Sequence, residues 1–311
     1  MTTKVFIDGK AGTTGLRIYE RLQERSDIEL MTLSDDDRKK PECRKAMLNS
    51  CDIAFLCLPD DASREAVAMI DNPDVVVLDT STAHRTLDDW AYGFPELSQA
   101  QFDKIKNSKR IAVPGCHASG FIALIQPLVD AGILPADALL CCHSLTGYSG
   151  GGKKLIAEYE DAERSVLYDA PRQYGLPQQH KHLKEMVKIS KLNNNPAFSP
   201  IVADYYSGML LTVPVFKSQL NSGYTIESIR EVYRNLYNGK MVYYAENATE
   251  NGLLSGNAMS GKDSMQIMVE GNEDRILLIA RYDNLGKGAS GAAVECMNIV
   301  MNKAPETGLD L

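Results

Sequence analysis

The sequence predicts an α/β protein that joins a doubly wound parallel sheet to an α+β domain with a mixed or antiparallel sheet. Three observations support this prediction. The first third of the chain alternates short β-rich runs with helical stretches, as βαβ units do. A glycine-rich turn directly follows the first of these runs. From about residue 139, longer strand candidates are no longer separated regularly by helices, which is typical of a mixed sheet.

The first domain is expected to follow the order of a Rossmann, or dinucleotide-binding, fold. The run IAFLCL at residues 53–58 is apolar on both faces, as a parallel strand covered by helices should be. Strands are predicted over residues 4–8, 28–33, 53–58, 75–79 and 111–113. Helices are predicted over residues 13–25 and 62–70.

The rest of the chain is expected to form a second domain and then return to the first. Strands are predicted over residues 139–145, 201–203, 209–216, 264–269 and 275–282. Helices are predicted over residues 121–129, 153–167, 183–189, 226–237 and 290–301. The last of these helices has apolar residues at helical spacing and needs a partner. If it covers the first domain, residues 1–115 and 285–311 form the nucleotide-binding domain and residues 116–284 the catalytic domain.

Composition excludes several classes of protein. The net charge of −8, without a basic block, argues against a nucleic-acid partner. No apolar run approaches the ~20 residues that cross a bilayer, and the N-terminus enters a strand at once, which leaves no room for a secretory leader. The seven cysteines are an odd number and lack zinc-site spacing, so reduced thiols and no metal are expected. We therefore expect a cytoplasmic protein without a membrane partner.

The turn after the first strand is a candidate dinucleotide site. Gly9, Gly12 and Gly15 would let backbone amides approach a pyrophosphate where Thr13 and Thr14 open the helix. The spacing is GxxGxxG rather than the commoner GxGxxG. An ordinary glycine-rich turn is the alternative.

The loop after the second strand leaves the type of cofactor open. Asp35, Asp36 and Asp37 would suit the ribose hydroxyls of NAD, whereas Ser34 and Arg38 would suit the 2′-phosphate of NADP. A solvated charged loop explains the acidic run about as well.

Cys116 is a candidate nucleophile, because it follows Pro-Gly where a strand ends and an apolar helix begins. A helix N-terminus favours the reactive thiolate. A structural role stays open on this local chemistry. His117 is adjacent in sequence, but neighbours at a helix start do not face each other, so it is not automatically the base for Cys116.

His180 and His182 are candidates for general acid/base chemistry near neutral pH. If their segment is extended, both side chains point to one face. Surface histidines are the alternative, and further metal ligands are lacking nearby in sequence.

Two glycine-dense segments open helices and could hold an anion or a carboxamide. The first contains Ser149 and Gly150, and the second contains Asn284 and Lys287. Plain capping turns are the alternative for either segment.

Taken together, these segments resemble the N-acetyl-gamma-glutamyl-phosphate reductase family of arginine biosynthesis, in particular its shorter form, type 2. This family lies within the wider group of phosphorylating semialdehyde dehydrogenases. The likeness runs nearly end to end. It rests on GKAGTTGLRI at 9–18, LDTSTAHR at 78–85, YGFPEL at 92–97, AVPGCHASG at 112–120, HKH at 180–182 and DNLGKGASGAAVECMN at 283–298.

The resemblance implies an NADP-dependent oxidoreductase that converts an acyl phosphate into an aldehyde through a thioester on Cys116. The family's HxHxPE segment matches only partly, since it reads HKHLKE here. His182 is the favoured acid/base, and His180 is a substrate contact or the alternative acid/base. The expected substrate contacts are Arg85, His180, Ser149, Gly150 and Lys287. The expected cofactor contacts are Gly9, Gly12, Thr13, Thr14, Gly15, Ser34, Arg38, Pro59 and Asn284.

A cysteine hydrolase without a nucleotide would leave Gly9, Gly12 and Gly15 unexplained, so two rival functions remain. One is another acyl-phosphate reductase, such as aspartate-semialdehyde dehydrogenase or an enzyme that acts on a carrier-bound aminoadipyl phosphate. The other is a non-catalytic, NADP-binding regulator. The resemblance further implies a small-molecule substrate and a homo-oligomer, either a dimer or a tetramer.

Overall fold

The computed structural model describes residues 2–34 and 36–311, which divide into two compact units. The first unit comprises the chain up to Pro95 together with Gln99–Gly115 and Ala289–Leu309. The second unit comprises Glu96–Ser98, Cys116–Gly288 and Asp310–Leu311. The return to the first unit therefore falls at residue 289 rather than at the expected residue 285. The roles expected for the two domains stay a prediction.

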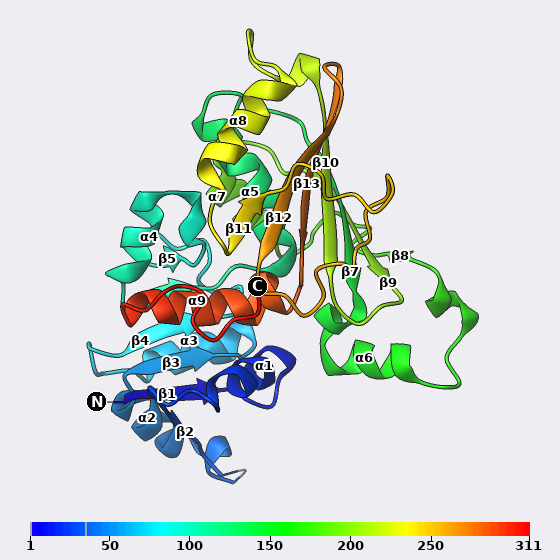
Figure 1. Ribbon diagram of the computed structural model, residues 1–311. Helices are drawn as coiled ribbons and strands as arrows, with labels where there is room; N and C mark the ends of the chain where they lie inside the picture. The colour runs from blue at the N-terminus through cyan, green and yellow to red at the C-terminus, as the bar shows by residue number, and fades with distance from the viewer. Residues whose placement is uncertain (1, 35) are drawn as a thin grey trace. The chain divides into compact units, whose positions relative to one another are not determined.

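The first unit is built on a parallel sheet of six strands in the order β2-β1-β3-β4-β6-β5 (Figure 1). Its strands are β1 (Thr3–Asp8), β2 (Ile28–Met31), β3 (Ile53–Leu56), β4 (Val76–Asp79), β5 (Ala91–Tyr92) and β6 (Arg110–Ala112). Chain order changes direction between β1 and β3, which pair in parallel. The predicted doubly wound fold is confirmed, and ligands of such folds bind at the carboxyl ends of the strands at this switch point.

Helices cover both faces of this sheet, because successive strand residues point to opposite sides. Val5 and Ile7 join a core cluster with residues of α1, α4 and α9, whereas Phe6 joins a second cluster with residues of α2 and α3. The helices are α1 (Thr13–Leu22), α2 (Pro41–Ser50), α3 (Asp60–Ala68), α4 (Gln99–Lys106) and α9 (Gly291–Val300). Almost all of α9 is buried, so the last helix is an integral part of this core.

The second unit is built on a mixed sheet of seven strands in the order β11-β12-β13-β10-β7-β9-β8 (Figure 1). Its strands are β7 (Cys141–Gly147), β8 (Arg172–Gln173), β9 (Ala197–Ala203), β10 (Met209–Phe216), β11 (Val242–Tyr244), β12 (Met265–Gly271) and β13 (Arg275–Tyr282). The β10–β13 ladder is antiparallel over the whole length of both strands, whereas β7 and β9 pair in parallel. The predicted mixed sheet is therefore confirmed.

Helix α5 is almost wholly buried within the second unit. The helices of this unit are α5 (Cys116–Asp130), α6 (Gly152–Glu160), α7 (Leu183–Ser190) and α8 (Ile226–Leu236). Pro127 lies inside α5 and has no N–H for the carbonyl of Ala123. The Tyr237 hydroxyl donates a 2.7 Å hydrogen bond to that carbonyl, so the buried oxygen keeps a partner.

Several element boundaries differ from the prediction. The helix expected at 121–129 begins at Cys116 itself, and the helix expected at 153–167 ends at Glu160. Helix α2 was not predicted, because Leu48 is its one buried residue and its apolar periodicity is weak. Across the described residues, no helix is both long enough and apolar enough to cross a membrane.

Candidate active site

Cys116 is half-buried at the amino end of α5. The Tyr282 hydroxyl donates a 2.6 Å hydrogen bond to the carbonyl of Cys116 and accepts one of 3.1 Å from the Gly120 amide. A Cβ at Gly120 would lie 2.6 Å from this hydroxyl, so the clamp requires glycine. Tyr282 thus fixes the first turn of α5, whose amides favour a thiolate.

Other cysteines of the chain sit in surroundings that disfavour the thiolate. Burial raises the pKa of Cys51 to about 11 and the pKa of Cys57 to about 12. Burial also raises the pKa of Cys142. Cys116 differs from these three because it lies at the start of a helix, α5.

His180 and His182 lie in the turn before α7, so their segment is not extended. The Leu183 amide donates to the His180 carbonyl (3.0 Å), and the His182 amide donates to His180 Nδ1 (3.2 Å). Their ring centroids nevertheless lie 4.8 Å apart. Nε2 of buried His182 lies 4.0 Å from Oε1 of buried Glu185. Burial, and then the charge of Lys181, lowers the pKa of His180.

His117 completes a cluster of three histidines that the sequence did not reveal. Its ring centroid lies 5.7 Å from that of His180 and 5.7 Å from that of His182. Its Nδ1 and Nε2 each lie 2.7 Å from a hydroxyl oxygen, of Ser144 and Tyr174 respectively. These partners are 27 and 57 residues away in sequence, and no local pattern links them to His117.

Asn284 is buried and held by both of its polar atoms. Its Oδ1 accepts from the Gly208 amide (2.9 Å), and its Nδ2 donates to Ser149 Oγ (2.9 Å). A Cβ at Gly150 would lie 3.4 Å from the same Nδ2. The structure therefore brings together Ser149, Gly150 and Asn284, which come from two separate glycine-dense segments.

Lys287 is fully buried, which the sequence did not predict. Its Nζ lies 2.6 Å from Oε1 of Glu96. Glu96 is 191 residues away in sequence and belongs to the same unit. The positive charge of Lys287 is thus matched within the protein.

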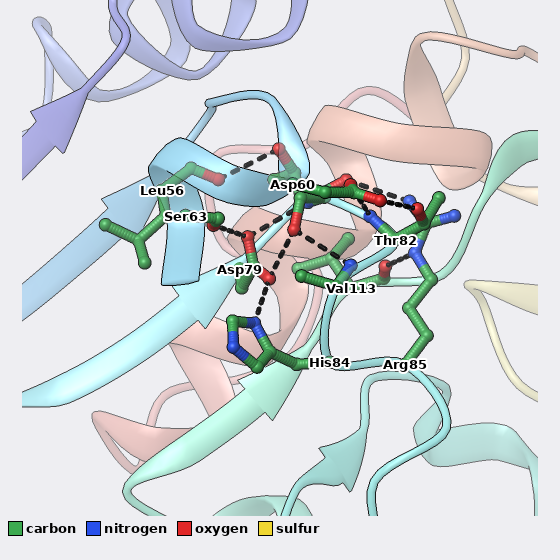
Figure 2. Close-up of polar contacts among 11 residues, drawn as sticks. Leu56, Asp60, Ser63, Asp79, Thr82, His84, Arg85 and Val113 are labelled. Atoms are coloured by element: carbon green, nitrogen blue, oxygen red, sulfur yellow. Dashed lines mark hydrogen bonds and ion pairs between the residues drawn. The ribbon is translucent and has the colours of Figure 1, made fainter. Parts of the chain in front are cut away.

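Arg85 is buried in the loop after β4. Its Nε donates to the carbonyl of Val113 (2.9 Å), and its Nη2 donates to the carbonyl of Thr80 (2.8 Å). The side chain of Thr82, in the same loop, donates to Asp60 at the start of α3. Figure 2 shows these contacts, which hold the loop and the guanidinium in place.

The same loop is anchored on Asp79, a fully buried carboxylate that sequence reasoning did not single out. His84 Nδ1, Ser63 Oγ and Ser81 Oγ each lie 2.6 Å from a carboxylate oxygen of Asp79 (Figure 2). Burial opposes ionisation most strongly, but the hydrogen bonds together outweigh it and lower the pKa of Asp79. The His84 ring stacks on Trp90 with centroids 4.1 Å apart.

The turn at Gly9 has the geometry of a phosphate cradle. Gly9 has φ +88°, and a Cβ there would collide with the backbone of Cys57. Gly12 is the N-cap of α1 and provides no side-chain cap for the amides of Thr13 and Thr14. This turn follows β1, and Pro59 follows β3 as the N-cap of α3. The residues at this switch point therefore fit a dinucleotide.

The loop after β2 is organised by its own side chains. Ser34 Oγ donates to the Asp37 carboxylate (2.8 Å) and accepts from the Asp37 amide (3.1 Å). Lys40 also pairs with Asp37 at 2.8 Å. Asp37 is therefore neutralised locally, and Arg38 lies within the same turn. Asp35 lies outside the described residues.

Two family models match most of the chain. Residues 4–105 match the NAD binding domain of semialdehyde dehydrogenase, and residues 116–284 match its dimerisation domain.

Curated relatives align over nearly the full chain. The N-acetyl-gamma-glutamyl-phosphate reductase 2 of Nostoc sp. is 43% identical and covers 98% of this chain and 99% of its own. The N-acetyl-gamma-glutamyl-phosphate reductases of Brucella ovis and Sinorhizobium medicae are 43% and 44% identical, and each covers 97% of this chain and 100% of its own.

Solved structures share the fold at low sequence identity. Aspartate semialdehyde dehydrogenase II of Vibrio cholerae, complexed with ASA, has a TM-score of 0.74 at 17% identity, over 97% of this chain and 99% of that chain. Aspartate semialdehyde dehydrogenase of Candida albicans, solved with NADP, has a TM-score of 0.65 at 14% identity, over 97% and 99% of the two chains. The family models and curated relatives go further than the fold: the chain belongs to the semialdehyde dehydrogenase family and, within it, to the N-acetyl-gamma-glutamyl-phosphate reductases.

Proposed function

We propose that this protein catalyses the NADPH-dependent reductive dephosphorylation of N-acetyl-gamma-glutamyl phosphate to N-acetyl-glutamate 5-semialdehyde and phosphate in arginine biosynthesis. Relatives named for this reductase, at 43% and 44% identity, support the choice of substrate. The observation that carries the chemistry is Cys116, which begins a buried helix without being sealed in the core. An accessible thiol in this place argues against a purely regulatory protein.

The Cys116 thiolate is the proposed nucleophile. Its sulfur attacks the γ-carbonyl carbon; the C–S bond forms, the bond from that carbon to the phosphate oxygen breaks, and a thioester and phosphate result. His182 donates a proton to the departing phosphate. Before this transfer, the nearby Glu185 carboxylate stabilises the protonated ring of His182. When bound, NADPH supplies the hydride that reduces the thioester carbon. The Cys116 sulfur then leaves as the thiolate and the aldehyde is released.

Five residues are assigned as substrate contacts. They are Arg85, His180, Ser149, Gly150 and Lys287. The hydrogen bonds from Arg85 to two backbone carbonyls support its assignment, because a fixed guanidinium suits an anionic group. The pairing of Lys287 with Glu96 makes this lysine a positioned group rather than a free charge.

Nine residues are assigned as cofactor contacts. They are Gly9, Gly12, Thr13, Thr14, Gly15, Ser34, Arg38, Pro59 and Asn284. The glycine cradle between β1 and β3 supports this assignment. In this proposal the first unit binds NADP and the second unit carries the acyl chemistry.

We also propose that the protein is a cytoplasmic homo-oligomer, either a dimer or a tetramer. The match to a dimerisation domain supports this. One face of β10 supports it as well, since Leu210, Thr212 and Pro214 are half-buried while the residues between them are buried. Light scattering on the purified protein measures the mass directly, and a monomer would contradict the proposal.

The function is tested by following NADP reduction with N-acetyl-glutamate 5-semialdehyde plus phosphate. Aspartate semialdehyde plus phosphate is the matched comparison. We expect turnover with the first aldehyde to exceed turnover with the second by a large factor. Equal or higher turnover of aspartate semialdehyde would assign the protein to the rival reductase.

A further inference from the structure

The segment formed by residues 283–288, directly after β13, packs against Cys116, and no step of the proposed reaction uses this contact. A Cβ built at Gly288 would lie 3.1 Å from Cβ and 3.4 Å from Cα of Cys116. The carbonyl oxygen of Asp283 is the third near atom, at 3.0 Å, so the sulfur of Cys116 lies farther away than its two carbons. The backbone at Gly288 therefore faces the base of the Cys116 side chain rather than its sulfur.

This close approach requires that position 288 carries no side chain. Distances of 3.0 and 3.1 Å are shorter than the optimum of about 3.5–4.0 Å between non-bonded carbon atoms. An alanine would therefore displace Cys116, or the segment itself, by a few tenths of an ångström. Gly288 does not have a positive φ, so the small size of glycine matters here and not its backbone freedom.

The buried carboxylate of Asp283 holds the 283–288 segment in place. Its Oδ2 accepts from Ser207 Oγ (2.9 Å) and from the Gly261 amide (2.5 Å), and its Oδ1 accepts from the Leu285 amide (2.7 Å). The Asp283 carbonyl accepts from the Gly288 amide (3.0 Å). Such a hydrogen bond across five residues is rare and is frequently found at functional sites. Asp283 therefore joins the two ends of the segment and ties it to the chain before β10 and before β12.

The same segment carries two residues of the proposed site. Asn284 and Lys287, proposed as cofactor and substrate contacts, lie between Asp283 and Gly288. A Cβ at Gly286 would lie 2.1 Å from the carbonyl oxygen of Lys262, so the middle of the segment is closely packed as well. A shift of the segment would move both proposed contacts together with the backbone that faces Cys116.

We propose that Gly288 and Asp283 are positioning residues for the nucleophile. Gly288 forms a backbone stop behind Cys116, and Asp283 holds that stop in place. Tyr282, the last residue of β13, restrains the carbonyl of the same cysteine. This inference rests on the proposed function, because it takes Cys116 to be the nucleophile. Both residues act only by placing other groups, and neither exchanges a proton.

Gly288→Ala tests the stop. Its methyl group should displace Cys116 and lower kcat about tenfold, because a small misplacement of a reacting group reduces the rate strongly. The KM values for NADP and phosphate should change less than about twofold. Alkylation of Cys116 by iodoacetamide at pH 7, followed by peptide mass mapping, should be several-fold slower, since the sulfur loses its alignment with the first amides of α5.

Asp283→Asn tests the residue that holds the stop. An amide group would present N–H donors where Asp283 accepts three hydrogen bonds, so the whole segment should shift. We expect kcat and the alkylation rate to fall as in Gly288→Ala. The KM values for NADP and phosphate should also rise several-fold, because Asn284 and Lys287 move with the segment.

Gly239→Ala is the matched control, since a Cβ there would lie 3.8 Å from the Val242 carbonyl oxygen, an ordinary contact distance. It should leave kcat and the alkylation rate unchanged. A wild-type alkylation rate of Cys116 in folded Gly288→Ala would overturn the proposal, even if turnover falls. If Gly288→Ala does not fold, the alkylation rate of Asp283→Asn decides. Lack of turnover in the wild-type protein would instead contradict the proposed function, and alkylation would still test the stop.

Discussion

His84 and His117 are both buried, yet their surroundings differ in charge and in origin. His84, in the first unit, contacts the carboxylate of Asp79 and stacks on Trp90. His117, in the second unit, contacts two hydroxyls and lies beside two further histidines. The first centre, Asp79 with His84, contains an ionised carboxylate. The second centre, His117 with Ser144 and Tyr174, contains a neutral imidazole.

The difference indicates two ways of building a rigid loop. Asp79 and His84 are five residues apart and Ser63 comes from the nearby helix α3, so the first centre holds one loop, the one that carries Arg85, against that helix. The partners of His117 come from β7 and from the loop after β8, so the second centre ties distant segments together at Cys116. A buried charge makes the first centre sensitive to loss of a partner. The second centre contains a neutral His117 ring, so its contribution to stability decreases in acid.

The largest expected effect is a loss of turnover without a loss of NADP binding. Cys116→Ser should lower kcat by a factor of about 10³ or more, because a hydroxyl is a far poorer nucleophile near neutral pH. NADP affinity should remain within a factor of about two, because Cys116 is not among the proposed cofactor contacts. Steady-state kinetics and cofactor titration measure both quantities.

Cys141→Ser is the control for this variant, since Cys141 is exposed in β7. It should keep wild-type turnover. Near-normal kcat in Cys116→Ser would refute the thioester mechanism.

The second effect tests the charged centre. Asp79→Asn should lower the free energy of unfolding by about 3 kcal/mol, because a buried carboxylate with several donors is lost. The pKa of Asp79 is lowered by folding, so its contribution is complete above the unfolded pKa of about 4 and disappears as pH falls through the folded value. The gap between wild type and variant should therefore narrow below about pH 4.

Urea unfolding at several pH values measures this gap. Asp61→Asn is the matched control, because Asp61 is an exposed carboxylate whose partner is the neighbouring Arg64. A gap that stays constant down to pH 2 would show that Asp79 does not contribute as a charge.

The third effect tests the neutral centre. The pKa of His117 is lowered to about 3 by folding, so the unfolded chain takes up a proton first as pH falls below about 6.5. Stability should therefore decrease from about pH 6.5 towards pH 3. In His117→Phe, the free energy of unfolding should fall by about 2 kcal/mol less than in the wild type between pH 6.5 and 5.

Exposed His143 offers the comparison within the same unit. His143→Phe should leave the slope of stability against pH as in the wild type. If stability against pH has the wild-type slope in His117→Phe as well, folding does not lower the pKa of His117 and the prediction is wrong.

Residues with a local signal could be placed from the sequence. The strand, glycine turn and helix at Gly9, and the strand end and helix start at Cys116, are defined within a dozen residues. The histidine cluster and the Lys287–Glu96 pair could not be predicted, because their members meet only when distant segments fold together. Helix α2 was missed for a different reason: Leu48 is its one buried residue, so it lacks an apolar stripe at helical spacing.

The smallest effect concerns the choice of cofactor in the first unit. We expect kcat/KM to favour NADPH over NADH by about tenfold, since Arg38 can pair with a 2′-phosphate while Lys40 and Ser34 occupy the carboxylate of Asp37. Arg38→Ala should lower kcat/KM for NADPH several-fold and leave the value for NADH unchanged. Lys45→Ala, which removes an exposed cation paired with Asp71, should change neither value. A clear preference for NADH in the wild-type protein would show that the acidic side chains of this loop dominate the ribose site.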